Sequence, residues 1–373
     1  MYRESIVRGR SLIFRVFFIS SITGIGTHSQ KILDVVLASK FSSRFIEVIN
    51  ALDLVAVADA TQRSGDSDIN LVFLPEEYCR HLRGTNLYWS VFEASRPPPA
   101  YSDWTQTFDH LICASQWGSS CFQNYGVPAE MLSVVPEGVD SDTYHPRGRV
   151  APVEKKRFLM VGKYERRKGY REAFQAFDLA WRDNKNIELL VKADWISPSG
   201  SQQHPAFLEL AQEFSHLPII SYSGVASVEE MRALYQSADY FLFPSRGEGW
   251  GLPLIEAIAC GCYAISCNYS GQSEYLKDID GLYASIPYQL VPVDCPDFIR
   301  AYAHEDGDNG QWALPDVAAL AQIISTCASN SFQDEALVAS EIIRRRYHWD
   351  NAGYSLIKLL LTRVIPKLGL GPV

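Results

Sequence analysis

Residues 238–266 read ADYFLFPSRGEGWGLPLIEAIACGCYAIS. The apolar run at 240–243 stops at Pro244, and a glycine-rich loop leads into apolar, helix-forming residues at 254–259. A second apolar run begins at Tyr263. Strand, loop, helix and strand in this order form the half-unit of a parallel α/β sheet. We therefore expect an α/β fold in which this loop follows the carboxyl end of a buried strand.

The junction between this loop and the helix has the chemistry of an anion site. Pro253 suits the first helical turn, where its missing N–H costs nothing, and the N–H groups and dipole of that turn attract an anion. Glu248 lies in the loop, and Glu256 lies about one turn inside the helix. Carboxylates beside an anion need another partner, and sugar hydroxyls can donate hydrogen bonds to them. A nucleotide sugar, with phosphate in its middle and a polyol at each end, satisfies both requirements.

Two glutamates separated by seven residues, with Gly-Leu between them, resemble the signature of the retaining glycosyltransferases of family 4. That family has the GT-B fold, in which two Rossmann-like parallel-sheet domains face an interdomain cleft. The resemblance implies that Glu256 holds the nucleotide ribose and that Glu248 and the following amides hold the transferred sugar and the phosphates. Those amides belong to Gly249, Trp250, Gly251 and Leu252. The alternative is an ordinary strand–helix turn with solvated carboxylates.

A second motif is the cationic run after the predicted strand RFLMVGK at 157–163. Cations at the start of a helix oppose its dipole, so they need another reason to be there, such as a bound diphosphate. The run resembles the phosphate clamp of the same family, in which Lys168 matches the lysine. Lys163 stands where the family usually has arginine, and an ammonium cannot make the bidentate fork of a guanidinium. Lys163 could serve as a point charge, or Arg166 or Arg167 could take the place of the family's arginine. The alternative is that these cations are simply a solvated run of charges.

The first half of the chain carries looser signals. Gly24 and Gly26 follow a predicted strand at 11–20 and resemble the glycine-rich loop of the family, which faces the donor, whereas a dinucleotide fingerprint would need a third glycine. A tight turn without a ligand is equally compatible with them. The next residue of chemical interest, His28, is only a candidate base.

Glu93 and Arg96 follow another predicted strand, where parallel sheets bind ligands. We expect both side chains near the reacting sugar or the acceptor, with a surface salt bridge as the alternative.

The predicted domains are residues 1–148, an acceptor-side Rossmann-like domain, and 155–346, the nucleotide-sugar domain. Residues 347–373 are expected to form a helix that packs back on the first domain. Helices are predicted from Ser29 to Ser39 and at several later positions. Short apolar runs alternate at 45–50, 54–58, 69–74 and 86–92, and the polar residues 60–68 predict a loop. Residues 286–316 are Pro-rich and read as an irregular inserted loop.

Composition narrows the class of protein. The formal net charge of -9 and pI near 5.4 disfavour nucleic acid as a partner. No stretch approaches the roughly 18 apolar residues that span a bilayer, and Arg15 interrupts the only run that resembles a signal peptide. Arg3, Arg8, Arg10 and Arg15 make the N-terminus basic, so a weak peripheral membrane contact is an alternative to a solvated terminus. Cys260, Cys262 and Cys267 lack a fourth zinc ligand nearby, and the cytoplasm is the expected compartment.

The resemblance implies metal-independent transfer of a hexose, with retention of configuration, from a donor of the GDP-mannose or UDP-glucose type. The acceptor would be a glycan or a lipid-linked or protein glycoconjugate. Lys163, Lys168 and the amides of the helix turn would neutralise charge on the leaving diphosphate, so no cofactor beyond the donor substrate is expected. A non-catalytic sugar-nucleotide-binding subunit and a GT-B epimerase or phosphorylase are the alternatives, while the missing third glycine disfavours a dehydrogenase.

Overall fold

The structure is a computed structural model that describes residues 13–21, 24–38, 46–73, 77–99, 107–148, 155–197, 200–202 and 204–368. The chain divides into two compact units, each built on its own sheet. The first unit comprises residues 1–92, 96–138 and 347–373, and the second comprises 93–95 and 139–346. The division therefore falls after Gly138 rather than at the predicted residue 148, and Glu93 belongs to the second unit.

A six-stranded parallel sheet forms the core of the first unit, in the order β2-β1-β3-β4-β5-β6. Its strands are β1 (Phe14–Phe18), β2 (Ile46–Asn50), β3 (Ile69–Val72), β4 (Thr85–Ser90), β5 (His110–Cys113) and β6 (Leu132–Val134). Its helices are α1 (Gly24–Ala38), α2 (Leu54–Arg63), α4 (Gln116–Asn124) and α13 (Trp349–Leu359), with 3-10 turns at Glu77–His81 and Ala129–Met131. The inner strands β3 and β5 are buried throughout, as strands covered on both faces are, whereas β2 is only partly buried.

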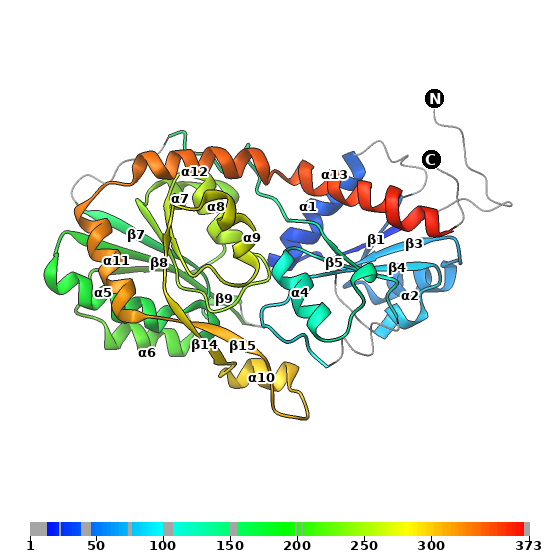
Figure 1. Ribbon diagram of the computed structural model, residues 1–373, viewed down its shortest axis with the longest axis horizontal. Coiled ribbons are helices and arrows are strands. Elements are labelled where there is room, and N and C mark those ends of the chain that lie inside the picture. Colours follow the sequence, from blue (N-terminus) through cyan, green and yellow to red (C-terminus); the bar gives the residue numbers. More distant parts are fainter. Residues whose placement is uncertain are drawn as a thin grey trace. The chain divides into compact units, whose positions relative to one another are not determined.

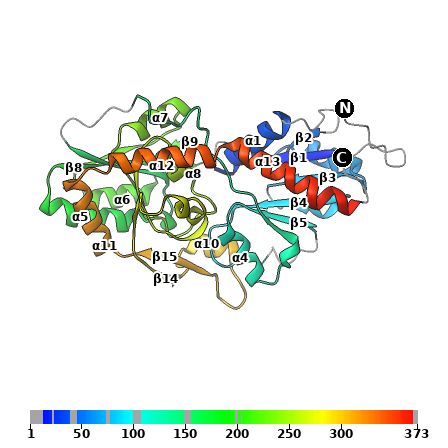
Figure 2. The same cartoon turned by 45° about the horizontal axis from the view of Figure 1, so that its top comes forward.

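Helix α13 packs against α1, as Figures 1 and 2 show. Gly353 permits the close approach, since a Cβ atom there would lie 1.7 Å from Val35 Cγ1. After α13 the chain continues through a π-helical turn, Leu360–Val364, and a 3-10 turn, Ile365–Leu368.

Three predictions for the first unit are corrected. Helix α1 begins at Gly24, so the residues expected to form a glycine-rich loop form the first turn of this helix. Gly26 allows this turn to pack on Ser21, because a Cβ atom at position 26 would lie only 2.1 Å from the Ser21 carbonyl oxygen. The apolar run at 54–58 belongs to α2, and the Asp53 side chain caps this helix by accepting hydrogen bonds from Val55 N and Ala56 N. Because α2 continues to Arg63, it includes the first residues of the predicted loop at 60–68. Arg15 is fully buried and bonded to Glu47 and Asp68, so it adds nothing to a basic surface. Arg3, Arg8 and Arg10 lie outside the described residues.

The second unit is built on a parallel sheet ordered β10-β8-β7-β11-β12-β13, with β9 antiparallel to β8. Its strands are β7 (Lys156–Lys163), β8 (Ile187–Ser197), β9 (Gly200–Gln202), β10 (Ile219–Tyr222), β11 (Tyr240–Phe243), β12 (Tyr263–Ser266) and β13 (Ala284–Ser285). Its helices are α5 (Tyr170–Asp183), α6 (Pro205–Glu213), α7 (Val228–Gln236), α8 (Leu252–Ala259), α9 (Ser273–Leu276), α11 (Val317–Ser329) and α12 (Gln333–Arg346). Short 3-10 turns occur at Arg166–Lys168, Ser270–Gln272 and Lys277–Ile279.

The predicted irregular loop at 286–316 is instead an ordered arm. It consists of β14 (Tyr288–Pro292), α10 (Pro296–Tyr302) and β15 (Gln311–Pro315), with the two strands paired antiparallel (Figure 1). The prolines misled the prediction because they stand at the ends of the strands and in the first turn of α10, where no ladder or helix bond is lost.

The predicted α/β class with two parallel-sheet domains is confirmed by this topology. None of the helices within the described residues is long and apolar enough to cross a membrane.

Candidate active site

The strand–loop–helix stretch folds as its sequence predicts. Strand β11 ends at Phe243 and α8 begins at Leu252, one residue before Pro253. Gly251 is the N-cap in the left-handed region, φ 94°, and no side chain caps the helix. Tyr275 donates to the carbonyl of Gly251 at 3.1 Å and holds the start of the helix in place. The first turn of α8 therefore keeps the positive end of its dipole directed at the loop.

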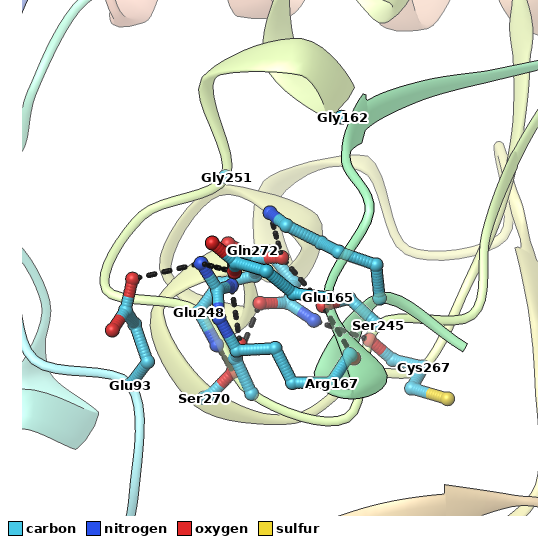
Figure 3. A network of polar contacts seen from close by, with 12 residues as sticks. Glu93, Gly162, Glu165, Arg167, Ser245, Glu248, Gly251, Cys267, Ser270 and Gln272 are labelled. Carbon is cyan, nitrogen blue, oxygen red and sulfur yellow. Dashed lines mark hydrogen bonds and ion pairs between the residues drawn. The ribbon is translucent and has the colours of Figure 1, made fainter. Parts of the chain in front are cut away.

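Glu248 is the buried centre of the loop, as Figure 3 shows. Its carboxylate accepts hydrogen bonds from Lys168 Nζ at 2.6 Å and from Ser245 Oγ, and it pairs with Arg167 Nη1 at 2.8 Å. Burial by itself would raise the pKa of Glu248, but the charges of Arg167 and Lys168 lower it to about 2. Glu248 is thus ionised across the physiological pH range.

Arg167 forms ion pairs with three carboxylates of the second unit. Its Nη2 atom pairs with Glu93 at 2.9 Å and Glu165 at 2.8 Å, while Nη1 pairs with Glu248 and donates to the carbonyl of Gly247 at 3.0 Å. Burial opposes the charge of this guanidinium, yet the three carboxylates raise its pKa above the ordinary value. Arg167 therefore orders the site as a fixed positive centre.

The four cations of the predicted clamp have different partners. Arg166 is exposed and bonds Asp294 at 2.7 Å, so it is committed to the arm. Lys163 is exposed, and among the described residues no hydrogen bond or ion pair holds it. Lys168 is buried beside Arg167, and burial followed by that repulsion lowers its pKa. The structure thus places Arg167 and Lys168, but not Lys163, in contact with Glu248.

Glu256 lies on the first turns of α8, and Tyr235 of α7 donates a hydrogen bond to its Oε2 at 2.8 Å. The buried ring of Tyr235 packs on Tyr144 and Phe241. Tyr235 therefore positions the Glu256 carboxylate, a contact that sequence reasoning missed because the two residues belong to different helices.

A second loop supports the Glu248 backbone. Ser270 Oγ accepts the Glu248 N–H at 2.9 Å and donates to Gln272 Oε1 at 2.9 Å. Ser270 adopts φ 63°, the only positive φ of a non-glycine residue in the described chain. Strain of this kind clusters at functional sites. No sequence signal pointed to Ser270, since a serine after Tyr269 looks like any turn residue.

The remaining loop residues are placed as follows. Trp250 is buried against the ring of Tyr275, with centroids 5.0 Å apart, so its indole supports the loop rather than lining a surface. A Cβ on Gly271 would lie 2.0 Å from Gly249 O, so the two loops are in tight contact.

Glu93 contacts residues of the second unit, whereas Arg96 contacts a residue of the first unit. The carbonyl of Glu93 accepts the Trp312 Nε1–H at 2.8 Å, and its carboxylate meets Arg167. The guanidinium of Arg96 instead lies over the ring of Tyr125, 5.2 Å from its centroid, within the first unit.

Gly24, Gly26 and His28 occupy the first turns of α1, in the first unit. His28 is buried among Phe73, Trp89 and Trp349, and its Nδ1 lies 3.1 Å from Glu137 Oε1. It is therefore a packed residue of a helix rather than of a loop, and its candidate general-base role stays a prediction.

Cys260, Cys262 and Cys267 are buried free thiols. Burial raises the pKa of Cys267 to about 12, which keeps it protonated. Within the part of the chain that the structure describes, no three His, Cys, Asp or Glu side chains gather as a metal site.

Several known proteins resemble this chain in fold or in sequence. Anabaena Alr3699/HepE, solved in complex with UDP and glucose, matches 94% of this chain and 99% of its own with a TM-score of 0.61 at 15% identity. Serotype-specific mannosyltransferase WbdA of Escherichia coli is 35% identical over 102 residues, 27% of this chain and 12% of WbdA. Glycogen synthase of Mycobacterium tuberculosis is 25% identical over 219 residues, 54% of this chain and 51% of that enzyme. The chain thus spans about half or less of the length of these curated relatives.

The two parallel-sheet units and the structural match define a protein with the GT-B fold. Residues 143–285, which contain the Glu248 site, match the family described as Glycosyl transferases group 1. The family match is thus confined to the part of the chain that holds the site.

Proposed function

We propose that the protein transfers a hexose from a nucleoside diphosphate sugar to a glycan or glycoconjugate acceptor, with retention of configuration and without a metal ion. The observation that carries this proposal is the buried cluster of Glu248, Arg167 and Lys168 beside the uncapped first turn of α8. Positive groups collect there beside a carboxylate that is itself ionised, which suits a ligand carrying both phosphate and hydroxyl groups.

Each residue has a separate role in this proposal. The Lys168 ammonium has three N–H donors, of which the bond to Glu248 uses one, so it can also bind the diphosphate. Lys163 adds a second positive charge, and the amides of Gly251 and Leu252 contribute the helix end. Together they would stabilise the charge that grows on the leaving diphosphate, usually the largest contribution of a site to such a transfer.

Glu248 would bind the transferred sugar through the acceptor capacity that remains to it. A carboxylate has about four acceptor positions, and Lys168, Ser245 and Arg167 occupy three of them. Glu256, oriented by Tyr235, would accept hydrogen bonds from the ribose hydroxyls. Glu93, which pairs with Arg167, would contact the sugar or the acceptor. Attack from the face of the leaving phosphate would then give retention without a protein base.

Mannose or glucose is the proposed hexose, with GDP-mannose or UDP-glucose as the type of donor. The names of the relatives, a mannosyltransferase and a glycogen synthase, support these two sugars. The proposed acceptor is a glycan, or a lipid-linked or protein glycoconjugate. The proposed location is the cytoplasm, with peripheral contact to the membrane.

Donor turnover by the purified full chain tests this function. We expect hydrolysis of one nucleoside diphosphate hexose, with the released sugar keeping its anomeric configuration by NMR, at a rate unchanged in 5–10 mM EDTA. Abolition by EDTA would overturn the metal-free mechanism, and inversion would overturn retention. Donor binding without any turnover would favour a sugar-nucleotide-binding subunit.

A further inference from the structure

A cavity of about 600 Å³ lies between the arm at 286–316 and the loop that leads from β7 to α5. Its walls come from α10 and β15 on one side and from the segment 163–172 and the start of α6 on the other. Ligand sites commonly have volumes of about 300–1,000 Å³. Glu248, Glu256 and the start of α8 are not among its lining residues, so most of it lies outside the site described above.

Ion pairs and hydrogen bonds hold the arm at this cavity. Asp294 bonds Arg166 at 2.7 Å and Arg246 at 3.1 Å, and the Arg246 side chain is almost fully buried. Trp312 is fully buried and donates to the Glu93 carbonyl, while Ala313 N donates to Arg246 O at 2.9 Å. These contacts give the cavity a fixed outer wall.

The charges in the cavity favour a neutral ligand. Arg166 is paired with Asp294, Arg171 with Glu213 at 2.9 Å, and Arg167 with its three carboxylates. Among the described lysines and arginines that line the cavity, only Lys163 has no paired carboxylate. Carboxylates of Glu165 and Asp297 also line the wall. A phosphate deep in this cavity would meet as many negative as positive groups, whereas hydroxyls could donate to the carboxylates.

Aromatic side chains in the cavity provide the apolar surface that a carbohydrate site needs beside its polar groups. Tyr164, Phe298 and Tyr302 line the cavity, and Tyr302 keeps 39% of its surface exposed. Phe298 packs between Tyr302 and Trp312, with centroids 4.9 and 5.1 Å away, so the aromatic wall is pre-formed. Burial, then the negative charges of Glu93 and Glu165, raise the pKa of Tyr302, so its hydroxyl remains a donor at neutral pH. Aromatic rings cover the C–H face of a pyranose while polar groups bind its rim.

We propose that this cavity is a subsite that binds a neutral hexose unit of the acceptor. Its position as part of an acceptor site rests on the proposed transferase function. The connection is structural, since Arg167 and Glu93 line the cavity and Arg167 also pairs with Glu248. The arm would thus select acceptors that already carry a sugar next to the residue being extended.

Ligand-observed NMR on the full chain tests the subsite without requiring catalysis. The probes are methyl α-mannoside and methyl α-glucoside, each added with UDP or GDP at saturation. We expect at least one hexoside to bind with the nucleotide present, and Tyr302→Ala and Phe298→Ala to weaken it at least tenfold. Leu290→Ala, an exposed change on the same arm, should leave binding unchanged.

Two further measurements, of donor hydrolysis and of nucleotide affinity, distinguish a wrong subsite proposal from a wrong transferase proposal. Tyr302→Ala should retain wild-type donor hydrolysis and nucleotide affinity, which also shows that it is folded. The subsite is refuted if neither hexoside binds, if both variants bind normally, or if nucleotide or inorganic phosphate displaces the hexoside. Hexoside binding without any donor turnover would support the cavity and refute the transferase proposal.

Discussion

At the scale of single residues, Lys168 is the cation whose geometry best suits a diphosphate. Its ammonium is buried next to Arg167 and holds Glu248 at 2.6 Å. In Lys168→Met we expect the dissociation constant of the nucleoside diphosphate to rise about 10–100-fold, as for loss of a hydrogen bond to a charged group. Calorimetry should show less than a threefold change for the nucleoside alone.

Lys358→Met, at an exposed lysine of the first unit, serves as the control for this change. Equal weakening of nucleoside and nucleoside diphosphate by Lys168→Met would contradict a phosphate role.

The Tyr235–Glu256 pair makes a graded prediction. Glu256→Ala should weaken nucleoside binding about tenfold, because a carboxylate that accepts ribose hydroxyls is lost. Tyr235→Phe should weaken it less, about 2–5-fold, since the carboxylate remains but loses its orienting donor. Binding of the matching 2′,3′-dideoxynucleoside diphosphate should be insensitive to both changes. Glu341→Ala, at an exposed glutamate of α12, should bind as wild type; unchanged affinity in Glu256→Ala would rule out ribose binding.

Glu248 gives the protein a defined dependence on acid. Its folded pKa of about 2 is below the ordinary 4.5, so its stabilisation is complete above about pH 4.5 and is lost as pH falls through 2. The full shift corresponds to about 3 kcal/mol of unfolding free energy. Glu248→Gln should therefore melt below wild type at pH 7, and the gap should narrow between pH 5 and pH 3. A gap that is constant over this range, measured by thermal unfolding, would show that the charge of Glu248 does not stabilise the fold.

At the scale of secondary structure, the beginning of α1 depends on close packing. A Cβ on Gly26 would meet the Ser21 carbonyl at 2.1 Å, whereas one on Gly24 would meet nothing within 4 Å. Gly26→Ala should thus lower the free energy of unfolding by about 1–3 kcal/mol, and Gly24→Ala should change it by less than about 0.5 kcal/mol. Comparable melting temperatures for the two variants would mean that α1 starts elsewhere in solution.

The arm shows how an element can be ordered without a clear sequence pattern. Its strands are only five residues each and α10 only seven, so no periodicity long enough to recognise was present. Its order comes from tertiary contacts instead, through Trp312 and Asp294.

At the scale of the whole molecule, binding of the donor nucleotide should stabilise the chain. A ligand at 100 times its dissociation constant adds about 2.7 kcal/mol to the unfolding free energy. In a thermal-shift panel of UDP, GDP, ADP and TDP, we expect one nucleotide to stand clear of the others, with the same shift in EDTA. If none of the four raises the melting temperature, the Glu248 cluster does not bind a nucleotide in the isolated chain.

Much of the fold followed from local patterns. Buried strands alternating with 3.6-period helices predict parallel sheets wherever the periodic segments are long, as in β7 and α5. The capping box of α7 is equally local, because both bonds between Ser227 and Glu230 lie within four residues. The loop carrying Glu248 was also predictable, since a glycine and a proline mark the point where β11 gives way to α8.

Other features were decided by contacts between distant parts of the chain. Three adjacent cations at 166–168 look alike in sequence, yet Arg166 binds the arm while Arg167 and Lys168 bind Glu248, 80 residues away from Lys168. The positive φ of Ser270 and the orientation of Glu256 by Tyr235 likewise arise only when separate elements pack together. Residue type and spacing determine which groups a chain can offer to a ligand, but burial and pairing determine which of them keep their charge and where they point.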